Sequence, residues 1–127
     1  LTDGLKYKSE NDGNGLYKVN EIRQNQSSGS NICKQQYSEL IKITSPSQML
    51  FLQGVISSNT ILSLDYRFFV SGQYVTKWRY DDGAEIADSS LWSVGQPEPS
   101  DGSCVMMTST GLSSVDCSQL LFFICHH

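Results

Sequence analysis

The sequence contains no apolar run that approaches the ~20 residues of a membrane-spanning helix. Hydrophobic residues make up 39% of the chain and charged residues 17%, which is typical neither of a membrane protein nor of a disordered one. The chain also shows no secretory leader, because polar residues follow Leu1 directly. We therefore expect a folded domain with no membrane span, in the form of a mature or trimmed product.

Basic residues are also few. The chain has nine Lys and Arg against 13 Asp and Glu, for a net charge of −4 and a sequence pI of about 4.9. The nine basic residues are scattered and form no run. Because a protein that binds a phosphate backbone needs a basic stripe, this composition argues against a nucleic-acid partner.

Motifs of the common enzyme classes are missing. The sequence has no Gly-x-Ser-x-Gly elbow, no His-Glu-x-x-His pair and no phosphate-binding loop. The only histidines, His126 and His127, are the last two residues, where an expression tag would also place them. If all four cysteines pair, no thiol is left to act as a nucleophile. We therefore predict that the protein is not an enzyme.

The four cysteines are not spaced as Cys-x-x-Cys, so the common zinc-binding spacing is absent. Four cysteines allow three pairings, and spacing alone does not choose among them. Disulfides indicate an oxidising compartment, and the sequon Asn25-Gln26-Ser27 agrees with a secreted, glycosylated protein. A length of 127 residues predicts one domain, residues 1–127.

Local patterns in the first half predict two strands and two helices. The Gly- and Asn-rich residues 11–15 predict a hairpin turn between two N-terminal strands, and a metal site at Asp12 is much less favoured. Ser27 or Ser28 would cap a helix over residues 30–37. Residues 40–43 predict a buried strand. A second helix then starts near Ser45, and its apolar residues recur at helical spacing: Met49, Leu50, Leu52, Val55 and Ile56.

The stretch from Trp92 to Cys125 has the most distinctive pattern. It opens with turn-forming Gly, Pro, Ser and Asp residues, including Gly95-Gln96-Pro97-Glu98. Two short runs suited to half-buried strands follow, at residues 104–107 and 120–125. Both begin or end at a cysteine, and a third cysteine lies between them.

This order of residues resembles the C-type lectin-like domain family, and residues 67–72 are closest to its secreted invertebrate members. The resemblance covers residues 16–125 and implies an α+β fold with two helices, antiparallel sheets and a long ligand-binding loop at residues 84–103. It also implies two disulfides, Cys33–Cys125 and Cys104–Cys117. The segments that match are Trp92, Gly95-Gln96-Pro97-Glu98, Cys104, Cys117 and Phe123-Ile124-Cys125.

Calcium-dependent members of that family carry Glu-Pro-Asn or Gln-Pro-Asp in the loop, with a cis proline that aims two side-chain oxygens at one ion. Gln96-Pro97-Glu98 starts four residues after Trp92 and eight before Cys104, which fits the family spacing better than Glu98-Pro99-Ser100 does. The match resembles the galactose-type motif, with Asp lengthened to Glu. The alternative is a proline-rich turn that holds no ion.

The second half of the family's calcium site, Trp-Asn-Asp, has no counterpart here. Leu112, Ser113 and Ser114 occupy those positions, and Ser hydroxyls are poor ligands for a divalent cation. Asp101 is the other carboxylate near the loop motif. We therefore predict a degenerate calcium site, with calcium as the only implied cofactor and a set of three candidate ligands: Gln96, Glu98 and Asp101.

The predicted function is glycan binding by a secreted C-type lectin-like module, leaning to galactose if calcium is used. The ligand-binding candidates are Gln96, Glu98, Asp101, Ser113, Ser114 and Tyr74. Among the aromatics, Tyr74 is the candidate for an exposed sugar contact, whereas the family uses the positions of Trp78 and Trp92 as core. The alternatives are calcium-independent protein recognition and a matrix-associated structural protein. A homo-oligomer would have to use the domain surface, since no coiled-coil pattern is present.

Overall fold

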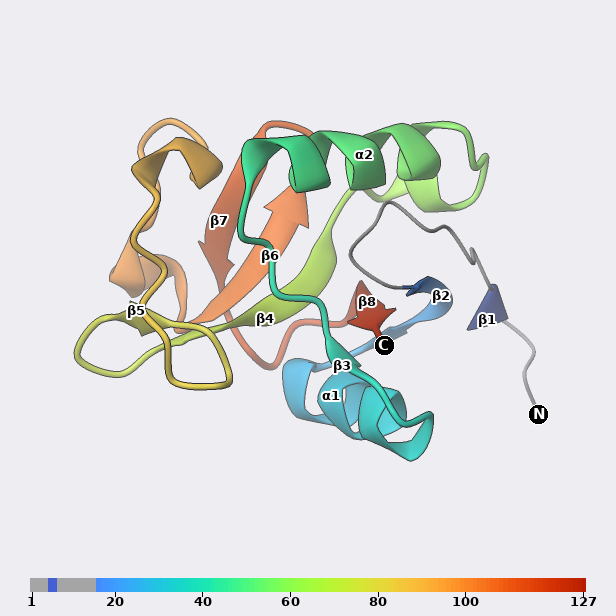
Figure 1. Ribbon diagram of the computed structural model, residues 1–127, viewed down its shortest axis with the longest axis horizontal. Coiled ribbons are helices and arrows are strands. Elements are labelled where there is room, and N and C mark those ends of the chain that lie inside the picture. The colour runs from blue at the N-terminus through green and yellow to red at the C-terminus, as the bar shows by residue number, and fades with distance from the viewer. Residues whose placement is uncertain (1–4, 7–15) are drawn as a thin grey trace.

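The computed structural model describes residues 5–6 and 16–127, with side chains from residue 16 onward (Figure 1). Within that part, the helices are α1 (Gln26–Gln35) and α2 (Pro46–Ser57), with short 3-10 helices η1 (Leu62–Leu64), η2 (Ser89–Leu91) and η3 (Pro99–Asp101). The strands are β1 (Leu5–Lys6), β2 (Tyr17–Gln24), β3 (Glu39–Leu40), β4 (Phe68–Tyr74), β5 (Trp78–Arg79), β6 (Cys104–Thr108), β7 (Gly111–Val115) and β8 (Leu121–His126).

The strands form one mixed sheet in the order β1-β2-β8-β4-β6-β7, with β3 paired to β8 and β5 to β4. The predicted α+β class with two helices is confirmed. The strands pair antiparallel, as expected, except that β4 and β8 run parallel with Phe68 opposite Phe122. Each of these strands follows a long connection, so no tight turn forces them to be antiparallel.

Helix α2 begins where the sequence predicts. Ser45 is the N-cap, its hydroxyl accepts from the Gln48 N–H at 3.2 Å, and Pro46 occupies the first turn. Gln48 in turn accepts from the Thr44 N–H at 2.8 Å, so both side chains satisfy free donors at the helix start. Leu50, expected on the apolar face, is 67% exposed instead.

Helix α1 begins and ends earlier than predicted. Asn25, not Ser27 or Ser28, is the N-cap, because its Oδ1 accepts from the Ser28 N–H at 2.9 Å. The helix ends at Gln35, since Tyr37 takes a φ of 58° that no α-helix continues.

Two further predictions concern the start of the sheet. Strands β1 and β2 pair antiparallel, as expected, while the predicted turn at residues 11–15 and Asp12 lie outside the described residues. The strand predicted over residues 40–43 is limited to β3. Beyond it, the N–H of Ile41 donates to the Ile124 carbonyl and its own carbonyl accepts from Ser71, so the chain crosses between β8 and β4.

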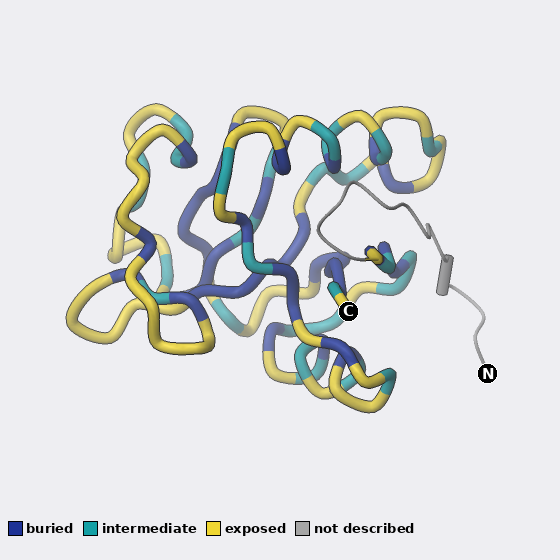
Figure 2. Tube along the Cα trace, viewed as in Figure 1, coloured by how far each residue is buried: buried dark blue, intermediate teal, exposed yellow. Residues whose placement is uncertain are grey.

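The core lies between the sheet and the helices, and the long loop lies mostly on the exposed surface (Figure 2). Both predicted disulfides are present, Cys33–Cys125 and Cys104–Cys117, with S–S distances of 2.06 and 1.99 Å. Trp78 is 8% exposed and Trp92 packs against the same core, as expected for these two positions. None of the helices in the described residues has the length and apolar character of a membrane span.

Candidate functional site

The long loop is held against strand β7 by one buried hydroxyl. Ser114 is 4% exposed, and its N–H and Oγ donate to Gln96 Oε1 at 2.9 and 2.7 Å. The same Oγ accepts from the Glu98 N–H at 3.0 Å and lies 2.8 Å from the Glu98 carbonyl oxygen. Three points of the loop motif therefore converge on one side chain.

Glu98 is the N-cap of η3 and Asp101 is its last residue, so both lie beside this contact. The Glu98 carboxylate caps η3: its Oε1 accepts from the N–H and Oγ of Ser100 at 3.4 and 3.1 Å. Gln96 Nε2 reaches Asp101 Oδ2 at 3.5 Å. The structure therefore brings Gln96, Glu98, Asp101 and Ser114 together. One oxygen of each carboxylate, Glu98 Oε2 and Asp101 Oδ1, has no protein hydrogen bond within the described part of the chain.

Ser113 and Tyr74 stand apart from this group. Ser113 is the neighbour of Ser114 on β7, so its side chain points to the opposite face of the strand, and it is 9% exposed. Tyr74 ends β4, is 37% exposed, and its N–H donates to the Ser103 carbonyl at 2.8 Å, just past η3. Its ring lies 5.1 Å from that of Trp78, which packs in turn on Trp92 at 5.4 Å.

Strand β7 also limits the end of the loop sterically. Gly102 follows η3 with a φ of 141°, and a Cβ there would lie 2.2 Å from the carbonyl carbon of Val115. Only glycine permits this approach. The loop is thus fixed at both ends of the motif, by Ser114 and by Gly102.

The donor set fits a hydrogen-bonded loop better than a calcium site. Calcium takes six to eight oxygen ligands, and Gln96 Oε1 and Glu98 Oε1 already accept hydrogen bonds from serines. Among the residues that the structure describes, no three His, Cys, Asp or Glu side chains lie close enough to hold a metal ion. The Gln96–Pro97 peptide is cis, as the resemblance implies. The set Gln96, Glu98 and Asp101 as metal ligands stays a prediction.

Sequence patterns did not reveal a second polar site. A pocket between α1, β3 and the end of β4 is lined by polar side chains, among them Gln26, Asn31 and Asp81. Their segments are far apart in the sequence, and each carries a common surface residue type. The one available signal was Gln26, a polar residue that the helix turns inward.

A comparison with protein-family models shows the family. The model for the lectin C-type domain matches residues 22–127, so the chain belongs to the C-type lectin domain family. Domains of this family typically bind ligands rather than catalyse reactions, and they are often extracellular, which the two disulfides fit. A comparison with curated protein sequences finds no match.

Three similar solved structures illustrate the range of the fold. A complex of SPL-1 with GlcNAc has a TM-score of 0.79 at 19% identity and covers 100% of this chain and 94% of that one. The Ca²⁺-independent C-type lectin SPL-2 from Saxidomus purpuratus has a TM-score of 0.79 at 18% identity, and the match covers 100% of this chain and 96% of that one. A calcium-independent type II antifreeze protein has a TM-score of 0.75 at 15% identity, and the match covers 100% of this chain and 93% of that one. At these identities the likeness establishes the fold alone.

Proposed function

We propose that this protein is a secreted, non-enzymatic glycan-binding module whose long loop works without calcium. One observation carries the proposal: the buried Ser114 hydroxyl holds Gln96 and Glu98 at the place where the resemblance expects an ion. Because these bonds fix the loop, no cation is needed to shape it. The GlcNAc complex of SPL-1 and the calcium independence of SPL-2 give precedents among similar folds.

The sugar would lie over η3 and Tyr74. The free oxygens Glu98 Oε2 and Asp101 Oδ1 accept sugar hydroxyls, and carboxylates make stronger hydrogen bonds than neutral acceptors do. The exposed ring of Tyr74 offers an apolar face to the C–H groups of the sugar. Ser113 contributes no direct contact in this arrangement, while Gln96 and Ser114 position the loop.

The identity of the sugar is tested by measuring retention of the protein on resins that carry different immobilised sugars, in buffer containing EDTA. We expect retention on immobilised GlcNAc or galactose, and galactose preference would agree with the Gln-Pro-Glu motif. Tyr74→Ala should weaken binding about tenfold, the loss of roughly 1.4 kcal/mol of stacking. Tyr37→Ala, which removes a more exposed ring past the end of α1, is the control and should bind as the wild type does. Equal binding by both variants would contradict the role of Tyr74.

Calcium-independent protein recognition is the second candidate. Val94 on the loop is fully exposed and Val75 is 72% exposed, next to Tyr74. Exposed apolar side chains become part of a protein interface when they gather into one patch. Val94→Ser separates the two functions, since it should leave sugar binding unchanged and weaken only a protein complex.

A further inference from the structure

A polar pocket lies between helix α1, strand β3 and the end of β4, elements that Figure 1 labels. Its volume is about 340 Å³, at the lower end of the ~300–1,000 Å³ range of small-molecule sites. Four segments form its walls: α1, β3, the end of β4 and the turn at Asp81.

Gln26 is the strongest sign that the pocket receives a ligand. It is the first residue of α1, and its backbone N–H donates to the Cys117 carbonyl at 3.1 Å, which fixes its position. The residue is 8% exposed, and its side-chain amide forms no hydrogen bond with any residue that the structure describes. The amide atoms are not enclosed by protein, so they stay open to water or to a ligand in the pocket.

Several other groups in the pocket are also free to bind. The side chains of Asn31, Lys34 and Glu39 form no hydrogen bond within the described part of the chain. The amide nitrogen of Gln73 makes only a long contact of 3.8 Å with the Cys104 sulfur, which leaves its carbonyl oxygen open to a ligand.

Asp81 presents a fixed acceptor on the opposite wall. Its Oδ1 accepts from the Gly72 N–H at 3.2 Å, and its own N–H donates to the Ser71 hydroxyl at 2.8 Å. Partial loss of hydration raises the pKa of Asp81, and its hydrogen bonds with Gly72 and Ser71 oppose this change. The carboxyl group is therefore held in place at the pocket wall.

The lining selects a neutral ligand rich in hydroxyl groups. Its polar character excludes an apolar molecule, and the carboxylates of Glu39 and Asp81 disfavour an anion. Lys34 on the same pocket disfavours a cation, and the described residues include no cluster suited to a metal. Amides offer both donors and acceptors, and each hydroxyl of a sugar is both as well. We infer that this pocket is a second saccharide-binding site, independent of the long loop.

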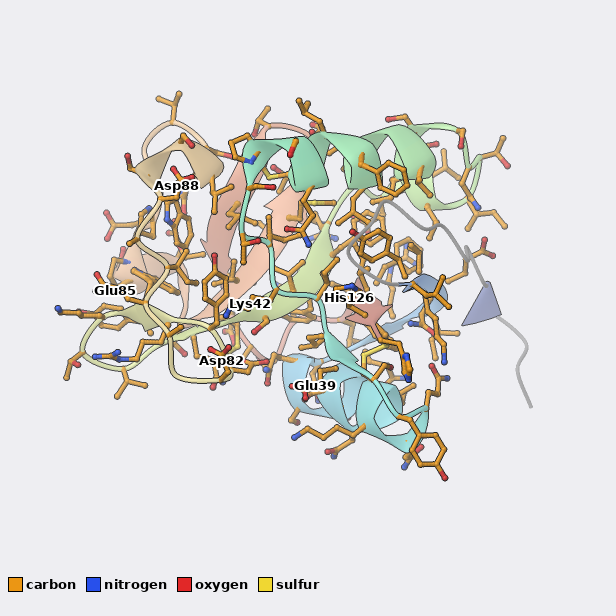
Figure 3. All side chains as sticks on the ribbon, in the orientation of Figure 1. Glu39, Lys42, Asp82, Glu85, Asp88 and His126 are labelled. Atoms are coloured by element: carbon orange, nitrogen blue, oxygen red, sulfur yellow. A yellow bond between two sulfur atoms is a disulfide. The ribbon has the colours of Figure 1, made fainter. Side chains whose placement is uncertain are left out.

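The site extends beyond one sugar ring. A second hollow of about 190 Å³ shares Glu39 and Leu40 with the first, so the two adjoin along β3. Lys42, Asp82 and His126 also line this second hollow, and Figure 3 labels them together with Glu39. The Lys42–Asp82 ion pair, 2.7 Å long, borders it. A disaccharide is therefore a better probe than a single sugar.

Two sources could supply the saccharide. Ser27, which lines the pocket, donates to Asn25 Oδ1 at 3.2 Å, so a glycan attached to the Asn25 sequon would begin at the pocket's edge. The other source is a glycan of another molecule. Both present the same hydroxyl chemistry, and the protein in its glycosylated and enzymatically deglycosylated forms distinguishes them.

The test titrates N,N′-diacetylchitobiose and lactose, in EDTA, into ¹⁵N-labelled protein made without N-glycans, and follows amide shifts. We expect saturable shifts in residues 26–34 and 73, apart from any in residues 96–114. Gln26→Leu should lower the affinity for the pocket more than tenfold while the melting temperature stays close to that of the wild type, because the amide makes no hydrogen bond that the fold would lose. Gln35→Leu, an exposed glutamine on the same helix outside the pocket, is the matched control and should bind normally.

Tyr74→Ala separates this site from the loop, because it should leave the shifts of residues 26–34 intact even if loop binding fails. In the glycosylated protein, blocked chitobiose binding that returns on deglycosylation assigns the pocket to the protein's own glycan, whereas unchanged binding assigns it to a foreign one. No saturable shift in residues 26–34 with either disaccharide, or unchanged affinity in Gln26→Leu, would overturn the proposal.

Discussion

Tyr37 follows helix α1 with a φ of 58°, in the left-handed region that favours glycine. The N–H groups of Tyr37 and Ser38 donate to the carbonyls of Lys34 and Cys33 at 3.0 and 2.9 Å, so the backbone of this helix end is fixed. The Tyr37 ring is 87% exposed and gains little from packing.

We expect Tyr37→Gly to raise the free energy of unfolding by about 1 kcal/mol, because glycine removes the cost of the left-handed conformation. Urea denaturation measures the change. Tyr37→Ala, which removes the ring and keeps the Cβ, should show no such gain. An equal gain in stability for both variants would mean that the tyrosine ring, and not the left-handed backbone, destabilises the wild type.

Asp65 carries the clearest pH dependence. Its side chain is 15% exposed, and its carboxylate forms ion pairs with Arg67 at 2.7 Å and with Arg23 at 3.0 Å. The hydrogen bond from Arg67, then that from Arg23, holds the pKa of Asp65 below its usual value, while partial burial opposes them. A lowered folded pKa stabilises the protein above the unfolded value near 3.8, and that contribution fades as the pH falls through the folded pKa.

Asp65→Asn should therefore destabilise the protein by about 1 kcal/mol at pH 7, and the difference from wild type should shrink below about pH 4. Denaturation at several pH values checks this. Glu85→Gln, in an exposed pair with Lys77 at 3.7 Å, serves as control and should change stability little. A constant difference across the pH range would exclude ionisation of Asp65 as the cause.

At the scale of elements, the contact between the long loop and β7 determines the shape of the site. Gly102 and Gly95 both have positive φ, 141° and 82°, but only Gly102 meets backbone atoms where a Cβ would stand. Gly95→Ala should cost about 1 kcal/mol for its φ alone. Gly102→Ala should cost at least ~3 kcal/mol or prevent folding, because two backbone segments must also separate.

The two alanine variants are compared by thermal unfolding. A similar loss of stability in both variants would mean that the loop can move away from β7 at little cost in free energy. In that case Ser114 would not hold a fixed sugar-binding face.

The elements with complete local signals were predictable from sequence. Ser45, Pro46 and Gln48 mark the start of α2, and the cap geometry follows from side chains next to each other in the chain. Helix α1 was misplaced because several consecutive residues can cap, and the choice of Asn25 depends on the contact of Gln26 with Cys117. Parallel pairing of β4 and β8 is likewise a tertiary outcome.

The loop motif was predictable, but its chemistry was not. Spacing from Trp92 and Cys104 located Gln96 and Glu98, and the loss of Asn and Asp at Ser113 and Ser114 was visible in the sequence. That Ser114 would accept and donate within the loop required three-dimensional contact across 18 residues. Sequence patterns depend on neighbouring residues and on periodicity, so they do not reveal such long-range contacts.

On the scale of the whole molecule, the two disulfides constrain very different lengths of chain. Cys33–Cys125 spans 92 residues and Cys104–Cys117 spans 13. In the chain-entropy model the first contributes about 4–5 kcal/mol and the second about 3. The first also joins α1 to β8 in the buried core, whereas the second closes β6 against the end of β7.

Replacing Cys33 and Cys125 together with alanine should therefore lower stability by more than replacing Cys104 and Cys117. Urea denaturation of the two double variants gives the ranking. The reverse order would mean that the short loop, rather than the closure of the whole chain, dominates the stability of the fold.

The most direct test of the account is a calorimetric titration of the protein with calcium, repeated with galactose, GlcNAc and mannose, and of each sugar in EDTA. Because Ser114 already holds the loop, we predict no saturable heat with calcium and the same sugar affinity with and without EDTA. Saturable one-site binding of calcium that tightens when galactose is present would contradict this account. It would show that Gln96, Glu98 and Asp101 act as metal ligands.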